Sequence, residues 1–285
     1  MLKQEMQYDF RKTYCQPHKR IYGAKERKAD ADELVLTEGV TISVNGLGQV
    51  AQVAARDFAA YLKTAFGIQA VLTDAEAVIT ASVAPEALDR GKGYMGRKTT
   101  VSEKGVKIEA FDERGVAQAF YALEERMNVR KAPFLKWGVT EQKPAFAPRM
   151  IHSAMGLDVY PDEYLSMIAH HGYDTILVFV RNESRSAHKN VDFDDLCRRA
   201  ARYGIDAYIY SYLRNYVHPH EEGAQEKYDA VFGDIFRKHP GFKGIVFVGE
   251  SADFPSKDPH VTALPHGQDA IDGIPTGKPN PGWDP

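Results

Sequence analysis

The stretch 174–180, DTILVFV, decides the fold class of the second half of the chain. It is almost continuously apolar, which is typical of a parallel strand that is buried on both faces. Strand patterns and helical patterns alternate around it, over 150–154, 161–171, 192–203, 206–210, 225–239 and 244–248. This order predicts four β/α units, which is the cadence of a (β/α)8 barrel.

The alternative to a barrel is a doubly wound sheet, but no glycine-rich phosphate-binding loop follows any of these strands. A complete barrel takes about 250 residues. The region after the prolines Pro133, Pro144 and Pro148 is much shorter than that. We therefore expect the first half of a barrel over 149–252, followed by an irregular tail over 253–285.

The first half of the chain has a different order of predicted strands and helices. Five strand patterns accompany two helical patterns, the strands over 40–44, 68–72, 77–81, 99–102 and 106–110 and the helices over 50–66 and 114–127. Glu103-Lys104-Gly105 lies between the last two strands and predicts a hairpin turn. The mixture indicates a small α+β domain over 34–132, with an N-terminal extension over 1–33 and a linker over 133–148.

The predicted fold class is therefore α/β, with a small α+β N-terminal domain followed by a partial, truncated TIM (β/α)8 barrel. The composition agrees, because 44% of the residues are hydrophobic and 26% are charged, as in globular proteins. A net charge of −3 gives no reason to expect nucleic acid or an anionic membrane as a partner. With no signal-peptide pattern at the start and only Cys15 and Cys197 as cysteines, we expect a cytoplasmic protein.

One glycine motif suggests a different function. Gly46-Leu47-Gly48-Gln49-Val50-Ala51 fits the dinucleotide-binding pattern G-x-G-x-x-A, and Asp74 stands roughly where a ribose-binding acid would be. The preceding strand carries Thr41 and Ser43 at alternate positions, whereas a central parallel strand is usually apolar throughout. We therefore favour a plain glycine-rich turn and keep a dinucleotide-dependent enzyme as the alternative.

Three segments carry a family resemblance: Thr100 to Ile108, Glu113 to Leu123 and Phe146-Ala147-Pro148-Arg149. They resemble the hairpin, the R-G-x-x-x-A helix and the barrel entry of glycoside hydrolase family 20 (β-N-acetylhexosaminidases). Family 67 α-glucuronidases are similar. The resemblance covers roughly residues 35 to 255 and implies a small α+β domain in front of a catalytic barrel.

The resemblance also implies roles for two residues. Arg149 matches the family 20 arginine that holds sugar hydroxyls, a task that suits a guanidinium fork; an interdomain salt bridge is the alternative. Glu250, at the end of the fourth barrel strand, matches the general acid. A glutamic acid whose pKa is raised can protonate the glycosidic oxygen. The alternative for Glu250 is a structural ion pair.

Two positions depart from the family 20 pattern. Gly249 stands where the hexosaminidases have the Asp that positions the acetamido group of the substrate. Val178 to Asn182 replaces the histidine-rich end of the second barrel strand. Substrate-assisted cleavage of an N-acetylhexosaminide is therefore in question, and Arg181 suits the carboxylate of a uronic acid instead.

Further polar and aromatic residues follow the strands and are expected at one mouth of the barrel, where they would bind and stack on sugars. The substrate-binding candidates are His152, Arg181, Asn182, Tyr210 and Asn215, with Glu183, Tyr212 and Arg214 beside them. For each of them an ordinary loop position is the alternative. His218-Pro219-His220 and His170-His171 are expected to be a solvated loop and a helix end, so we predict no metal and no cofactor.

These observations predict a glycosidase acting on a hexosaminide or uronide, with Glu250 as general acid and a carbohydrate as partner. The reaction normally needs a second carboxylate, for which Asp253 and Glu183 are weak candidates. A non-catalytic carbohydrate-binding module and a truncated structural fragment remain alternatives. An unclosed barrel exposes strand edges, so we also expect self-association.

Overall fold

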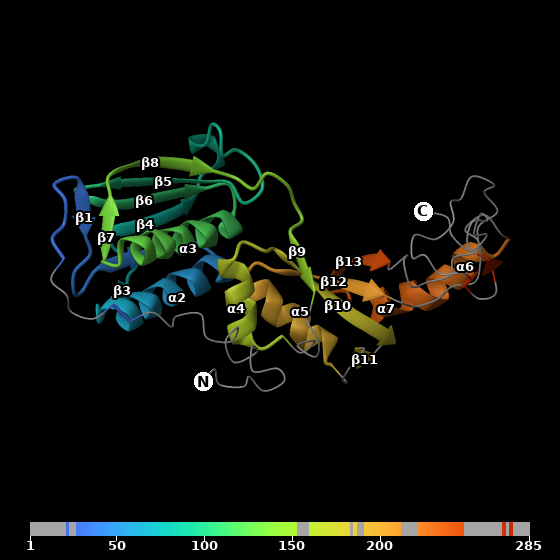
Figure 1. Cartoon of the computed structure of the whole chain (residues 1–285). Coiled ribbons are helices and arrows are strands. Elements are labelled where there is room, and N and C mark those ends of the chain that lie inside the picture. Colours follow the sequence, from blue (N-terminus) through green and yellow to red (C-terminus); the bar gives the residue numbers. More distant parts are fainter. Residues whose placement is uncertain are drawn as a thin grey trace, which may run out of the picture. The chain divides into compact units, whose positions relative to one another are not determined.

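The computed structural model describes residues 21–22, 27–152, 160–182, 185–186, 191–211, 222–247, 270–271 and 274–275. The chain forms two compact units. Unit 1 consists of Met1–Met150, Pro161–Asp174 and Arg199–Ile205, and unit 2 consists of Ile151–Tyr160, Thr175–Arg198 and Asp206–Pro285. Both units contain a sheet and helices (Figure 1).

The sheet of unit 1 has six strands in the order β3-β2-β4-β6-β5-β8. Their bounds are β2 (Thr41–Ser43), β3 (Val71–Leu72), β4 (Ile79–Val83), β5 (Arg97–Ser102), β6 (Gly105–Ala110) and β8 (Gly138–Gln142). The strands β3, β2, β4 and β6 are parallel, and β5 is antiparallel to both β6 and β8. Ser102 pairs with Gly105, which confirms the predicted hairpin.

Two long helices cover one face of this sheet: α2 (Gln49–Phe66) and α3 (Glu113–Arg130) (Figure 1). The ring centroids of Phe58 and Phe120 lie 5.4 Å apart where the helices meet. Gly67 ends α2 in the left-handed conformation, at φ 75°, as a glycine C-cap does. Asp112 caps α3, because its carboxylate accepts a 2.7 Å hydrogen bond from the Gly115 N–H. Both predicted helices are confirmed.

The segment 133–148 was expected to be a linker and instead carries two strands. The first, β7 (Phe134–Lys136), pairs with β1 (Glu33–Val35), and the second, β8, forms an edge of the six-stranded sheet. With three residues, β7 is too short to show a periodic pattern, although Phe134 and Leu135 are buried. The edge strand β8 buries little, and its Val139 is 63% exposed. The prolines Pro133 and Pro144 lie outside these strands, where no ladder hydrogen bond is lost.

Unit 2 contains the barrel-type sheet. Its parallel strands are β10 (Thr175–Asn182), β12 (Asp206–Ser211) and β13 (Phe242–Phe247). The strands β9 (Met150–His152) and β11 (Arg185–Ser186) pair with β10. The predicted fold class is confirmed, and within the described residues the sheet is open rather than closed into a barrel.

The remaining elements are η1 (Pro85–Ala87), α4 (Asp162–His170), α5 (Phe193–Arg202), α6 (Ala224–Tyr228), the π-helical turn η2 (Asp229–Gly233), α7 (Asp234–Lys238), β14 (Ala270–Ile271) and β15 (Ile274–Pro275). The helix predicted over 225–239 is thus helical with a π-turn in its middle. The helices after unit 1's long pair lie where the sequence predicted them, whereas η1 was not predicted and the short strands β14 and β15 pair within the segment 253–285 that was expected to be irregular. Across the described part of the chain, we find no helix that is long and apolar enough to cross a bilayer.

Candidate functional site

Three aromatic side chains from neighbouring strands of unit 2 form one cluster. His152 ends β9, Phe179 lies on β10 and Tyr210 lies on β12. Phe179 and Tyr210 are direct partners in the parallel ladder, with ring centroids 4.8 Å apart and ring planes at 86°. The His152 ring is stacked with the Tyr210 ring at 6.2 Å and 11°, and meets the Phe179 ring edge-on at 5.9 Å. We call these three residues the strand-end aromatic cluster.

The strand pleat separates this cluster from the buried face of the sheet. Val178, Val180 and Ile209, which are neighbours of Phe179 and Tyr210 along the strands, are at most 3% exposed. Successive side chains on a strand point to opposite faces. Phe179 and Tyr210 are therefore on the other face, where they are half-buried, and His152 is exposed. A partly exposed group of flat rings is suited to stacking on the apolar face of a sugar.

The structure thus brings together two of the predicted sugar-binding residues, His152 and Tyr210, and adds Phe179. The sequence analysis missed Phe179 because it lies inside an apolar run. The register of the two strands, in which Thr175 pairs with Asp206, makes Phe179 the partner of Tyr210, and only the structure gives this register.

The other candidates are described only in part. The backbone of Arg181 and Asn182 forms the end of β10. Glu250 and Asn215 lie outside the described residues, as do Glu183, Tyr212, Arg214, Asp253 and 218–220.

Arg149 lies in unit 1, immediately before β9. Its backbone N–H donates a 2.9 Å hydrogen bond to Oδ1 of Asp174, and its Nη2 lies 3.5 Å from Sδ of Met95. Since His152 is at the carboxyl end of the same strand, Arg149 is at the amino end. Barrel enzymes carry their substrate sites at the carboxyl ends, so this position favours packing within unit 1 over sugar binding.

The glycine motif is explained by an internal carboxylate. Gly48 caps the start of α2, and its N–H donates a 2.5 Å hydrogen bond to Oε1 of Glu113. An ideal Cβ on Gly48 would lie 2.6 Å from the same oxygen. A helix N-terminus attracts anions, and here the Glu113 carboxylate takes the place that a pyrophosphate would need. The arrangement favours the plain turn over dinucleotide binding.

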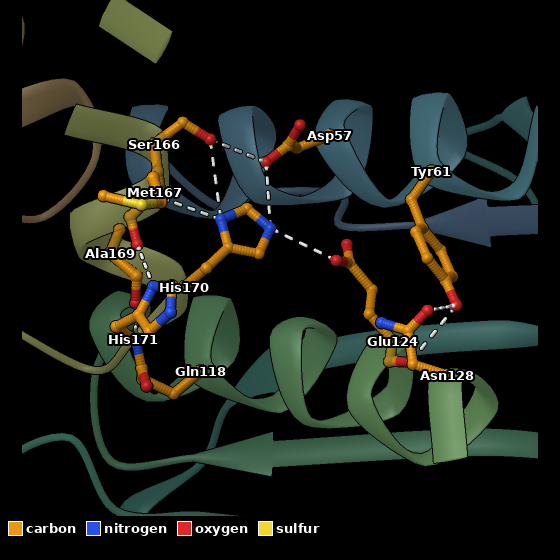
Figure 2. Close-up of polar contacts among 10 residues, drawn as sticks. All are labelled: Asp57, Tyr61, Gln118, Glu124, Asn128, Ser166, Met167, Ala169, His170 and His171. Atoms are coloured by element: carbon orange, nitrogen blue, oxygen red, sulfur yellow. Dashed lines mark hydrogen bonds and ion pairs between the residues drawn. The ribbon is translucent and has the colours of Figure 1, made fainter. Parts of the chain in front are cut away.

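A second group of polar side chains lies inside unit 1, between α2, α3 and α4 (Figure 2). His170 Nε2 lies 3.3 Å from Oδ2 of Asp57 and 3.2 Å from Oε2 of Glu124. The helix end predicted at His170-His171 is confirmed by α4, but His170 is largely buried and has two carboxylate neighbours, whereas His171 is exposed. No set of three His, Cys, Asp or Glu side chains among the described residues has metal-binding geometry.

Sequence comparison gives no relative: no family model and no curated protein matches the chain. Solved structures do match. The GH20 β-N-acetylhexosaminidase from Streptomyces coelicolor A3(2) aligns with a TM-score of 0.60 at 13% identity, over 82% of this chain and 60% of that one. A mutant β-hexosaminidase from Streptomyces plicatus aligns with a TM-score of 0.53 at 15% identity, over 69% of this chain and 46% of that one. A β-N-acetylhexosaminidase from Bacteroides fragilis aligns with a TM-score of 0.51 at 12% identity, over 75% of this chain and 53% of that one.

At these identities the likeness shows the fold, which is glycoside hydrolase-like. The chain spans between 46% and 60% of the length of these three structures. The part it spans includes a small α+β portion and an open barrel-type sheet, in the order that the sequence predicted.

Proposed function

We propose that this protein is a glycosidase that acts on a hexosaminide or a uronide, with Glu250 as its general acid. The observation that carries the proposal is the strand-end aromatic cluster. Three rings from adjacent strands converge on the accessible face of a glycoside hydrolase-like sheet. Solved structures with a similar fold include enzymes named as β-N-acetylhexosaminidases.

The chemistry follows from the positions along the strands. Glu250 comes three residues after the end of β13, the strand next to β12. The cluster would hold the sugar ring by stacking, and Glu250 would donate a proton to the glycosidic oxygen as the bond breaks. Arg181 and Asn182 end β10, where they would contact a carboxylate or hydroxyls of the sugar.

The test is hydrolysis of a panel of aryl glycosides: N-acetylglucosaminide, N-acetylgalactosaminide, glucuronide and neutral hexosides. We expect Glu250→Gln to lower kcat by roughly 100-fold or more, which is the usual effect of losing a general acid. Glu103→Gln, at the exposed tip of the β5–β6 hairpin, is the matched control and should retain full activity. An unchanged rate in Glu250→Gln would exclude Glu250 as the acid.

The aromatic cluster is tested separately by binding. Phe179→Ala and Tyr210→Ala should weaken the binding of the same sugars, measured by saturation-transfer NMR, by about 2- to 12-fold each. This corresponds to the roughly 0.5–1.5 kcal/mol that an aromatic contact contributes. Sugar binding without any hydrolysis would favour the non-catalytic carbohydrate-binding alternative. If the chain neither binds nor hydrolyses these sugars, both the glycosidase proposal and the carbohydrate-binding alternative are rejected.

A further inference from the structure

The buried cluster of His170, Asp57 and Glu124 joins three helices through one imidazole ring. Asp57 is on α2, Glu124 is on α3 and His170 is the last residue of α4 (Figure 2). The side chain of Glu124 is 5% exposed, that of His170 14% and that of Asp57 20%. The charges therefore meet where water screens them poorly.

The hydrogen-bond geometry indicates which ring nitrogens carry protons. His170 Nδ1 lies 2.7 Å from the carbonyl oxygen of Ser166. Because a carbonyl oxygen can only accept, Nδ1 must donate and therefore carries a proton. Nε2 faces two carboxylate oxygens, which also only accept when they are ionised. The proton on Nδ1 follows from its hydrogen bond. A second proton, on Nε2, is favoured by the charges of the two carboxylates, which lie at ion-pair distance from Nε2 and not in well-directed hydrogen bonds.

Two hydroxyl-bearing side chains, Tyr121 and Ser166, also contact the cluster. The Tyr121 ring of α3 lies 3.9 Å from the His170 ring, and Ser166 Oγ of α4 donates a 3.1 Å hydrogen bond to Asp57. Tyr203, after α5, lies near Asp57, and burial together with Asp162 and Asp57 raises its pKa.

We propose that His170 is a proton-controlled latch that docks α4 onto α2 and α3. With the ring protonated, its positive charge lies between two carboxylates and holds the three helices together. When the ring loses its proton, the two carboxylates lose the positive charge that lies between them. The loss of this attraction favours opening of the contact.

The direction of the pH dependence follows from the environment of the ring. Burial alone lowers the pKa of His170, but the close Glu124 carboxylate and the charge of Asp57 raise it more, so the net pKa is above 6.5. Because the folded state raises the pKa of His170, the protonated ring stabilises that state fully at a pH below the ordinary pKa of 6.5. This stabilisation is lost as the pH rises through the raised pKa. The latch is therefore closed in weak acid and opens towards alkaline pH.

Gln118 of α3 adds a second tie to α4, because its Nε2 donates a 2.8 Å hydrogen bond to the Ala169 carbonyl. This amide contact does not titrate, so the pH-dependent part of the docking belongs to the His170 cluster.

The experiment is amide hydrogen exchange of the full-length chain between about pH 6 and pH 9, corrected for the intrinsic exchange rates. We expect the protection of the α4 amides to fall about tenfold for each unit by which the His170 pKa exceeds its unfolded value. In His170→Gln, protection should be low and independent of pH. His171→Gln is the matched control, because His171 is the exposed neighbour on the same helix end, and it should behave as the wild type.

A second variant keeps the proposal testable if His170→Gln does not fold. Glu124→Gln removes one of the two carboxylates, so the opening should move to lower pH, together with the His170 titration followed by NMR of the imidazole. Protection of α4 that does not change with pH in the wild-type chain would overturn the latch. Equal effects of His170→Gln and His171→Gln would also overturn it.

Discussion

Arg149 and Asp174 exchange two hydrogen bonds at the starts of β9 and β10. The Arg149 N–H donates to Oδ1 of Asp174 at 2.9 Å, and the Asp174 N–H donates to the Arg149 carbonyl at 3.2 Å. Asp174 is fully buried. The pair therefore fixes where the two strands begin.

Replacing Asp174 tests this relationship. Asp174→Ala leaves the Arg149 N–H without its acceptor and should lower the free energy of unfolding by about 1–3 kcal/mol. Asp174→Asn keeps an oxygen at the same place and should cost clearly less. Urea unfolding at neutral pH measures both, and an equal loss in the two variants would assign the effect to the charge of Asp174.

Glu113 should act as an internal anion at the start of α2. Glu113→Ala removes the acceptor of the Gly48 N–H and a favourable charge at a helix N-terminus, so we expect a loss of about 1 kcal/mol in stability. Millimolar NAD should leave the melting temperature of the wild-type chain unchanged. A clear rise in the melting temperature with NAD would support the alternative that the chain binds a dinucleotide.

Gly115 should tolerate no side chain. An ideal Cβ at this position would lie 2.3 Å from the backbone oxygen of Gly96, so α3 would have to move away from the sheet. We expect Gly115→Ala to cost about 1–3 kcal/mol, as overpacking does. Glu125→Ala, at an exposed position of the same helix, should change stability by less than about 0.5 kcal/mol in the same thermal melts.

Cys197 should be an unreactive thiol in the folded chain. Burial, with the nearby Asp194 carboxylate, raises its pKa to about 12, so almost no thiolate forms at pH 8. Iodoacetamide should modify Cys197 only after denaturation, as followed by peptide mass mapping, which separates it from Cys15. Rapid modification of Cys197 in the native chain would contradict the buried position.

The open sheet of unit 2 should promote self-association. Within the described residues β13 has a neighbour on one side only, and an unpaired strand edge is a template for another strand. Sedimentation velocity should therefore show dimers or larger species that grow with concentration. A concentration-independent compact monomer would reject this expectation.

Much of the fold was predictable from local patterns. The apolar run at 174–180 became β10, the helical spacing from Val50 became α2, and Glu103-Lys104-Gly105 marked the β5–β6 hairpin. The helix shows the 3.6-residue repeat of its backbone, the apolar run shows a strand buried on both faces, and the Glu-Lys-Gly stretch shows turn chemistry. The strand β7 was missed because three residues are too short to show a repeat, and β8 was missed because it is a largely exposed edge strand.

The sequence by itself determined the order of the elements, the α+β part ahead of the barrel-type part, and His152 and Tyr210 as strand-end candidates. Only the tertiary structure decided which side chains meet. Phe179 became the partner of Tyr210 through the register of two strands, and His170 met Asp57 and Glu124 through the packing of three helices. Such contacts join residues far apart in the chain, and no local periodicity encodes the distance between them.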